Sequence, residues 1–147
     1  MKSVPRAQPD EASSVPRRTT IRQVMTRAPH TIGSHQKLAA AHVMMRELGL
    51  RHLPVMRGSE LVGVLSQRDL YFLETLAGVD VDIDQVTDAM TAEVYTVGPD
   101  DALRDVARAM AESRRGCAVV MEDGRVVGIF TATDALRHLA DALPASF

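Results

Sequence analysis

Apolar and polar positions follow the same order in the two halves of the chain. Residues spaced three or four apart predict an amphipathic helix in each half: Leu38, Ala41, Met45 and Leu48 in the first, and Leu103, Val106, Ala107 and Met110 in the second. Two apolar runs joined by a polar turn follow each helix and predict a hairpin covered on both faces: 53–56 with 61–65, and 118–121 with 126–130.

Turn and cap residues predict the remaining elements of each half. A strand ends before turn-forming residues at 31–32 and at 96–97. A second helix begins where each hairpin ends, at Ser66 and at Thr131. Each half therefore predicts strand, helix, strand, strand, helix, and a short helical lead-in precedes it at 19–25 and at 83–90.

The two halves form an ungapped internal repeat. Met25 recurs as Met90 and Asp69 as Asp134, and the offset is 65 residues in both cases. Such a repeat indicates that one small fold has been duplicated. Because 147 residues amount to about one ordinary domain, the two copies are expected to share a core and to pack against each other.

The chain divides into five predicted segments. The first is rich in Pro, Ser and Arg and is expected to be a flexible tail. The segments are the tail at 1–18, a first unit at 19–78, a linker at 79–83, a second unit at 84–143 and a C-terminal end at 144–147.

Composition argues against several classes of partner. The formal net charge is −2, and three Phe, two Tyr and no Trp leave few stacking platforms, so nucleic-acid binding is not expected. No apolar run is long enough to span a bilayer, so no membrane association is expected either. Cys117, the one cysteine, lies in an apolar run, which fits a buried thiol and a reducing cytoplasm.

Neither catalysis nor metal binding is indicated. No Ser, Cys or Thr accompanies a recognisable His and acid arrangement, and the five histidines show no metal-ligand spacing. Asp80, Asp82 and Asp84 alternate in the linker, but they lack the glycine and the distal Glu of a calcium loop. We predict no enzyme activity, no metal site and no required cofactor.

The candidate chemistry lies in a hydroxyl-x-x-Asp motif that occurs twice, at Ser66 with Asp69 and at Thr131 with Asp134. In one interpretation it is a helix cap, in which the hydroxyl accepts a backbone N–H and the acid reaches back to the cap residue. In the other, Asp is too short to reach back well, and its carboxylate accepts hydrogen bonds from a vicinal diol. Residue spacing alone leaves both open, with capping favoured.

These motifs resemble the cystathionine-β-synthase (CBS) domain. The resemblance rests on Val24-Met25-Thr26, Arg51-His52-Leu53-Pro54-Val55 and the segment 61–70, and on the same order in the second copy. It extends from Thr19 to about Leu139 and is similar to a tandem CBS pair, or Bateman module. It implies an α+β fold of two pseudo-symmetric units packed sheet to sheet, with clefts between them.

The resemblance also implies an adenosine-containing ligand such as AMP, ADP, ATP or S-adenosylmethionine, with the Asp of each motif on the ribose. The ribose and phosphate residues implied are Ser66, Arg68, Asp69, Thr131 and Asp134. Those around the base are Thr26, Leu50, His52, Leu53, Pro54, Thr91, Arg115, Cys117, Ala118 and Val119. Because Thr133 and Cys117 replace Arg68 and His52 in the second copy, the first site is expected to suit an anionic nucleotide better.

We therefore predict a regulatory module that senses an adenosyl ligand and signals to another, unidentified protein. The alternative is a constitutive dimerisation or protein-interaction module in which Asp69 and Asp134 only cap helices. A homodimer is expected in either case. Its predicted surface is formed by apolar residues of the two second helices: Leu70, Tyr71, Leu73, Leu136 and Leu139.

Overall fold

The first half contains the predicted strand, helix, strand, strand, helix. The computed structural model describes residues 18–145, so the predicted tail lies almost wholly outside the described residues. The elements are β2 (Ile32–Gly33), α3 (Leu38–Leu48), β3 (His52–Arg57), β4 (Glu60–Ser66) and α4 (Gln67–Glu74). Gly49 ends α3 in the left-handed conformation, with φ of 66°, a backbone shape that glycine adopts without steric cost.

The second half repeats the same elements. They are β5 (Thr96–Val97), α6 (Leu103–Ser113), β6 (Cys117–Glu122), β7 (Arg125–Thr131) and α7 (Ala132–Ala142). Even the irregularities correspond, because the register of the hairpin shifts between Val55 and Met56 in one copy and between Val120 and Met121 in the other. The predicted order of elements is confirmed in both copies.

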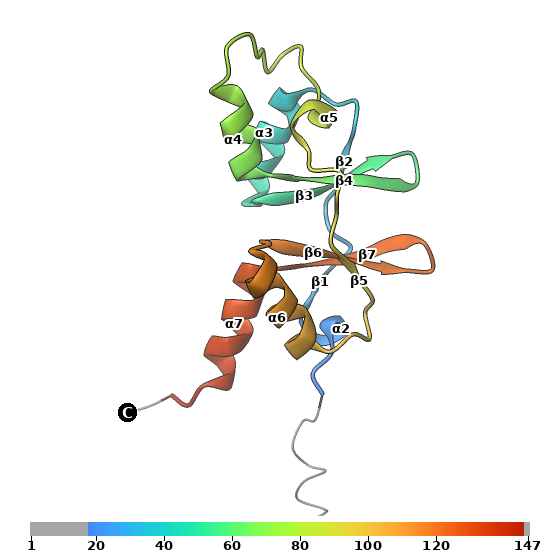
Figure 1. Ribbon diagram of the computed structural model, residues 1–147, viewed down its shortest axis with the longest axis vertical. Coiled ribbons are helices and arrows are strands. Elements are labelled where there is room, and N and C mark those ends of the chain that lie inside the picture. The colour runs from blue at the N-terminus through green and yellow to red at the C-terminus, as the bar shows by residue number, and fades with distance from the viewer. Residues whose placement is uncertain (1–17, 146–147) are drawn as a thin grey trace, which may run out of the picture.

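The two lead-in helices are exchanged between the halves. Helix α2 (Ile21–Val24) precedes the first unit in sequence, but Ile21 is fully buried in the core of the second unit. Helix α5 (Val86–Ala89) places Val86 in the core of the first unit in the same way. Figure 1 shows α5 beside α3 and α4, and α2 beside α6. Each spatial unit therefore combines segments from both sequence ranges, 19–78 and 84–143.

Backbone hydrogen bonds fix this exchange twice, with the same 65-residue offset. The Ile21 amide donates to the Asp101 carbonyl at 3.0 Å, and the Val86 amide donates to the Gln36 carbonyl at 2.8 Å. In addition, Leu38 at the start of α3 donates to the Asp84 carbonyl at 3.0 Å. The exchanged segments thus satisfy backbone groups that a helix start would otherwise leave without partners.

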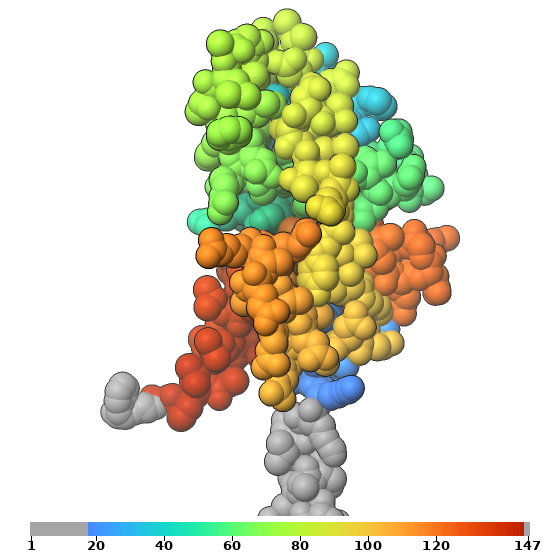
Figure 2. Space-filling view, viewed as in Figure 1, coloured from blue at the N-terminus to red at the C-terminus, as the bar shows by residue number. Residues whose placement is uncertain are grey.

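The two sheets face each other across the middle of the molecule (Figure 1). The first has the order β2-β3-β4. The second has the order β1-β7-β6-β5, because β1 (Thr26–Arg27), which follows α2, pairs antiparallel with β7. On the other side, Thr91 and Val64 exchange two backbone hydrogen bonds of 2.9 Å. In Figure 2 the segment that contains Thr91, in yellow, runs from one half to the other.

Two glycines allow the crossing segments to approach the sheets. A Cβ atom at Gly128 would lie 2.5 Å from Met25 Sδ and 3.0 Å from the Thr26 carbonyl oxygen. A Cβ atom at Gly63 would lie 2.6 Å from Met90 Sδ. Contacts below 3.0 Å essentially never occur between real atoms, so a side chain at either position would force its neighbours to shift. Within residues 18–145, no helix is both long and apolar enough to cross a membrane.

Candidate functional site

Two clefts open between the units, and each is lined by both copies of the repeat. Cleft A contains Asp69 and has a volume of about 620 Å³, and cleft B contains Asp134 and has a volume of about 660 Å³. Residues 91–95 and 114–117 of the second copy complete cleft A, whereas residues 26–30 and 49–52 of the first copy complete cleft B. The sequence does not show which segments accompany which Asp. In the structure, each Asp shares its cleft with segments from the other copy of the repeat.

In cleft A the carboxylate of Asp69 is not used by the helix cap. Ser66 Oγ accepts the Asp69 backbone N–H at 3.0 Å, as a cap should. Among the hydrogen bonds of the described residues, the carboxylate accepts one, from Thr91 Oγ1 of the other copy at 3.2 Å. Asp69 therefore retains free acceptor capacity at the cleft surface.

In cleft B the carboxylate of Asp134 is engaged. Asp134 Oδ2 accepts the Thr131 backbone N–H at 3.0 Å, while Thr131 Oγ1 accepts the Asp134 N–H at 3.2 Å, which completes a capping box. Arg137 donates to Asp134 Oδ1 at 3.1 Å, and the Asp134 side chain is only 11% exposed. The expectation that Asp is too short to reach back is wrong here, because this carboxylate does close the box.

Most predicted site residues line a cleft. The predicted residues that line cleft A are Ser66, Arg68, Asp69, His52, Thr91, Arg115 and Cys117. Those that line cleft B are Thr26, Leu50, His52, Thr131 and Asp134. Four others belong to the interiors of β3 and β6, are fully buried and line neither cleft, because strands covered on both faces hide their side chains: Leu53, Pro54, Ala118 and Val119. Their side chains therefore contribute no surface to either cleft.

The clefts also contain residues that the sequence analysis did not name one by one, although residues just after the two Met-Thr pairs were expected near the base. Tyr71, Glu93 and Tyr95 line cleft A, and Arg27 and Arg137 line cleft B. The Arg115 guanidinium lies 5.7 Å from the centroid of the Tyr95 ring, within range of a cation–π contact. The repeat offers a signal for some of them, since the 65-residue offset relates Tyr95 to His30, which lines cleft B.

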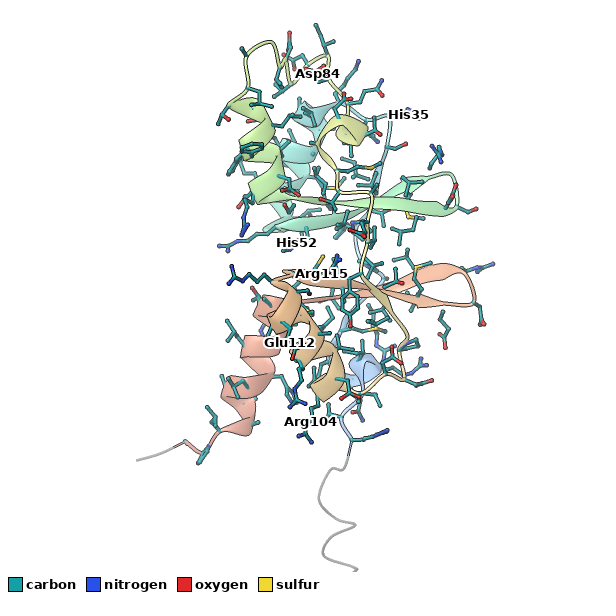
Figure 3. All side chains as sticks on the ribbon, in the orientation of Figure 1. His35, His52, Asp84, Arg104, Glu112 and Arg115 are labelled. Carbon is teal, nitrogen blue, oxygen red and sulfur yellow. The ribbon has the colours of Figure 1, made fainter. Side chains whose placement is uncertain are left out.

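Net charge does not separate the clefts. Cleft A has four arginines and two carboxylates, and cleft B has three arginines and one carboxylate, so arginines outnumber carboxylates by two in each. Arg114 and Arg115 line cleft A itself. The clefts differ instead in the hydrogen-bond partners of the aspartate carboxylate. They also differ in that Tyr71 and Tyr95 line cleft A, whereas the residues that line cleft B include no tyrosine. Figure 3 shows His52 and Arg115 on opposite sides of the gap between the sheets.

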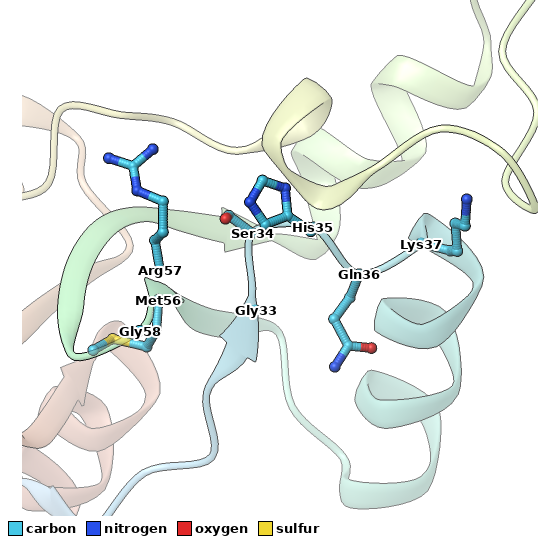
Figure 4. A pocket seen from close by; sticks show the side chains of 8 residues that line it. All are labelled: Gly33, Ser34, His35, Gln36, Lys37, Met56, Arg57 and Gly58. Carbon is cyan, nitrogen blue, oxygen red and sulfur yellow. The ribbon is translucent and has the colours of Figure 1, made fainter.

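A third hollow lies away from both aspartates, where the loop before α3 meets the end of β3 (Figure 4). It has a volume of about 430 Å³ and is lined by Gly33, Ser34, His35, Gln36, Lys37, Met56, Arg57 and Gly58. The Ser34 hydroxyl is buried there, and no residue within 18–145 forms a hydrogen bond with it. Because only one copy of the repeat lines it, a ligand in this hollow would not bridge the two units.

Burial shifts two titratable groups of the clefts. It raises the pKa of the Cys117 thiol to about 11, and Arg115 acts in the opposite direction. Cys117 is therefore protonated and weakly nucleophilic at neutral pH. Burial also lowers the pKa of His52, with Arg51 adding to the effect and Asp69 opposing it.

The lowered pKa of His52 predicts a pH-dependent stability. Below about pH 6.5 the unfolded chain protonates this histidine while the folded chain does not, so the free energy of unfolding decreases as the pH falls through that value toward the folded pKa. Urea unfolding between pH 7.5 and pH 5.5 measures the effect. His52→Gln is expected to lose less stability over this interval than the wild type, and an identical pH dependence in the two proteins would contradict the assignment.

Comparison with known families identifies the fold. The family model for the CBS domain matches residues 21–73 and, again, residues 86–141. The chain belongs to the CBS domain family. The two CBS domains correspond to the two copies of the repeat, and together they form the Bateman module that the resemblance implied, with its sheets packed face to face.

Several relatives share this CBS pair. Hypoxic response protein 1 of Mycobacterium tuberculosis is 29% identical over 124 residues, which cover 84% of this chain and 87% of that protein. Inosine-5'-monophosphate dehydrogenase of Korarchaeum cryptofilum is 34% identical over 105 residues, which cover 71% of this chain but only 21% of the enzyme. The crystal structure of CBSX2 in complex with AMP matches with a TM-score of 0.70 and 25% identity, and covers 83% of this chain and 96% of that one.

Proposed function

We propose that this CBS pair is a non-catalytic regulatory module that binds an adenine nucleotide or adenosyl metabolite in cleft A and signals to a partner protein. The observation that carries the proposal is the free carboxylate of Asp69, which lies beside the Thr91 hydroxyl at the cleft surface. An ionised carboxylate can accept hydrogen bonds from both hydroxyls of a ribose diol. The similar CBSX2 structure contains AMP, which supports this class of ligand.

The rest of cleft A suits the other parts of such a ligand. Arg68, Arg114 and Arg115 line it, and guanidinium groups bind phosphate through paired hydrogen bonds. Tyr95 offers an aromatic surface for a base. Asp69 would recognise the ribose that AMP, ADP, ATP and S-adenosylmethionine share, whereas the arginines favour the phosphorylated members of this group.

Signalling would follow from differential affinity. A ligand in cleft A contacts both halves of the molecule, so it stabilises the relative orientation of the units in which those contacts form. Only this difference in affinity can shift the equilibrium between orientations. A partner that binds one orientation better would respond to the ligand concentration. We place this activity in a reducing cytoplasm, which the buried free thiol of Cys117 supports.

A thermal-shift screen tests the proposal, with AMP, ADP, ATP, S-adenosylmethionine and NADH as ligands. A ligand at 100 times its dissociation constant adds about 2.7 kcal/mol to the free energy of unfolding, which is easily detected. The matched control is 2',3'-dideoxyadenosine monophosphate, which lacks the diol and is expected to give no shift. An equal shift with the dideoxy analogue would remove the role of Asp69, and no shift with any ligand would overturn the proposal.

The second candidate is a constitutive interaction module, and exposed apolar side chains favour it. Helices α4 and α7 expose Tyr71, Phe72, Leu136 and Leu139, at 51–66% of their full surface. Leu70, which was expected on this surface, is instead fully buried in the first core. A face of this kind suits a homodimer contact. A chain that forms a stable dimer in sedimentation and gives no ligand shift would support this candidate over the sensor.

A further inference from the structure

Two residues, Arg51 and His52, line both clefts at once. Gly116, at the repeat position of Arg51, also lines both. His52 Nε2 lies only 2.9 Å from where a Cβ atom of Gly116 would be, so the imidazole packs directly against this glycine. We refer to Arg51, His52 and Gly116 as the shared wall.

The two copies of the repeat contribute chemically different residues to the shared wall. The first copy supplies a cation and an imidazole, whereas the second copy supplies Gly116 and the buried thiol of Cys117 at the corresponding positions. A symmetric pair of clefts would have one arginine of this kind each. Among the arginines of residues 18–145, only Arg51, which is exposed, lines both clefts. It can make short, charge-assisted hydrogen bonds to an anion in one cleft at a time.

Backbone hydrogen bonds connect the wall to both hydroxyl-x-x-Asp motifs. The Arg51 carbonyl accepts the N–H of Gln67, the first residue of α4, at 2.8 Å. The Gly116 carbonyl accepts the N–H of Ala132, the first residue of α7, at 2.9 Å. The wall is therefore hydrogen-bonded directly to the start of the helix that carries Asp69 and to the start of the helix that carries Asp134.

We propose that the two clefts bind anionic ligands with negative coupling, because Arg51 of the shared wall serves only one of them at a time. This inference rests on the proposed function and adds to it a rule for occupancy. Once a nucleotide in cleft A binds Arg51, this guanidinium is no longer available to an anion in cleft B. The negative charge of the first ligand also repels that second anion. Couplings between sites of one protein are commonly 5- to 150-fold, and we expect a value of about tenfold.

Isothermal calorimetry tests this with AMP and, separately, ATP. Because the clefts differ in structure, unequal affinities alone do not show coupling, so the affinity of cleft B is compared in two states. In the wild type it is the second binding step, with cleft A filled. In Asp69→Ala, binding in cleft A is weakened, so cleft B fills while cleft A is still largely empty, and cleft B is expected to bind about tenfold more tightly than in the wild-type second step.

Two variants and one neutral ligand identify the source of the coupling. Arg51→Ala is expected to reduce the tenfold difference to the part that comes from repulsion between the two ligands, whereas Arg114→Ala removes a cation that lines cleft A alone and should preserve the full difference. Adenosine, which has no phosphate, should bind the two clefts without coupling. The same affinity of cleft B in both states, an unchanged difference in Arg51→Ala, or equal coupling with adenosine would overturn the inference while leaving nucleotide binding intact. Absence of binding by both AMP and ATP would overturn the inference, which requires anionic ligands, and absence of binding by ADP and S-adenosylmethionine as well would overturn the proposed function.

Discussion

Replacing Gly128 by valine is expected to destabilise the fold by about 3 kcal/mol, at the upper end of the usual cost of inserting atoms into a packed interior. The new side chain would meet Met25 Sδ, which can move, and the carbonyl oxygen of Thr26, which cannot move without breaking the pairing of β1 with β7. Loss of that pairing would also loosen Ile21 from the second core. Urea unfolding measures the change.

The matched control for this substitution is Gly98→Ala. A Cβ atom at Gly98 meets nothing closer than 3.8 Å, so alanine there should leave stability unchanged or raise it slightly. A Met25→Ala change is expected to rescue Gly128→Ala only in part, because the contact with the Thr26 carbonyl oxygen remains. Wild-type stability of Gly128→Val would show that the crossing segment does not depend on this glycine.

Asp69→Ala and Asp134→Ala are expected to affect different properties: the first should weaken nucleotide binding, and the second should lower the stability of the fold. Asp69→Ala should weaken nucleotide binding in cleft A by about 100-fold, because two charge-assisted hydrogen bonds to the diol are lost and each factor of ten corresponds to about 1.4 kcal/mol. Its effect on unfolding should be small, since the cap uses Ser66 Oγ and the Asp69 backbone. Calorimetry and urea unfolding of the same samples measure both quantities.

Asp134→Ala should instead cost about 1–2 kcal/mol of stability and leave cleft A able to bind. The change removes the acceptor for the Thr131 N–H and leaves that group without its partner in a half-buried position. The exposed pair with Arg137 contributes little, because water screens it. Equal losses of binding in both variants, or a larger loss of stability in Asp69→Ala, would contradict the distinct roles assigned to the two carboxylates.

The sequence was sufficient for the order of the elements, because the repeat shows every turn and cap twice. The site residues that the family resemblance implied remain predictions, and most of them line the two clefts. The sequence could not show the exchange of α2 and α5. Both copies have the same apolar pattern, so Ile21 fits either core equally well as far as periodicity is concerned. Only the three-dimensional path of the chain after Met25 and Met90 decides which core each helix enters.

The difference between the two aspartates was also beyond motif reasoning. Both belong to the same hydroxyl-x-x-Asp pattern, yet their carboxylates have different partners. A residue three positions further on distinguishes the two copies, since Arg137 binds Asp134 whereas Phe72 occupies the corresponding place after Asp69. Neighbours that lie outside a motif can thus determine whether its acid caps a helix or remains available to a ligand.

The exchanged lead-in helices also bear on the ancestry of the chain. Three pairs of backbone hydrogen bonds in the exchange are related by the offset of 65 residues, as they would be in a twofold symmetric pair of identical chains. A single ancestral copy could have completed its core only with the lead-in of a second copy. Gene fusion would then have joined the two subunits of a segment-swapped homodimer. In a single chain the two copies need not have the same sequence, and Arg51 and His52 of the first copy correspond to Gly116 and Cys117 of the second.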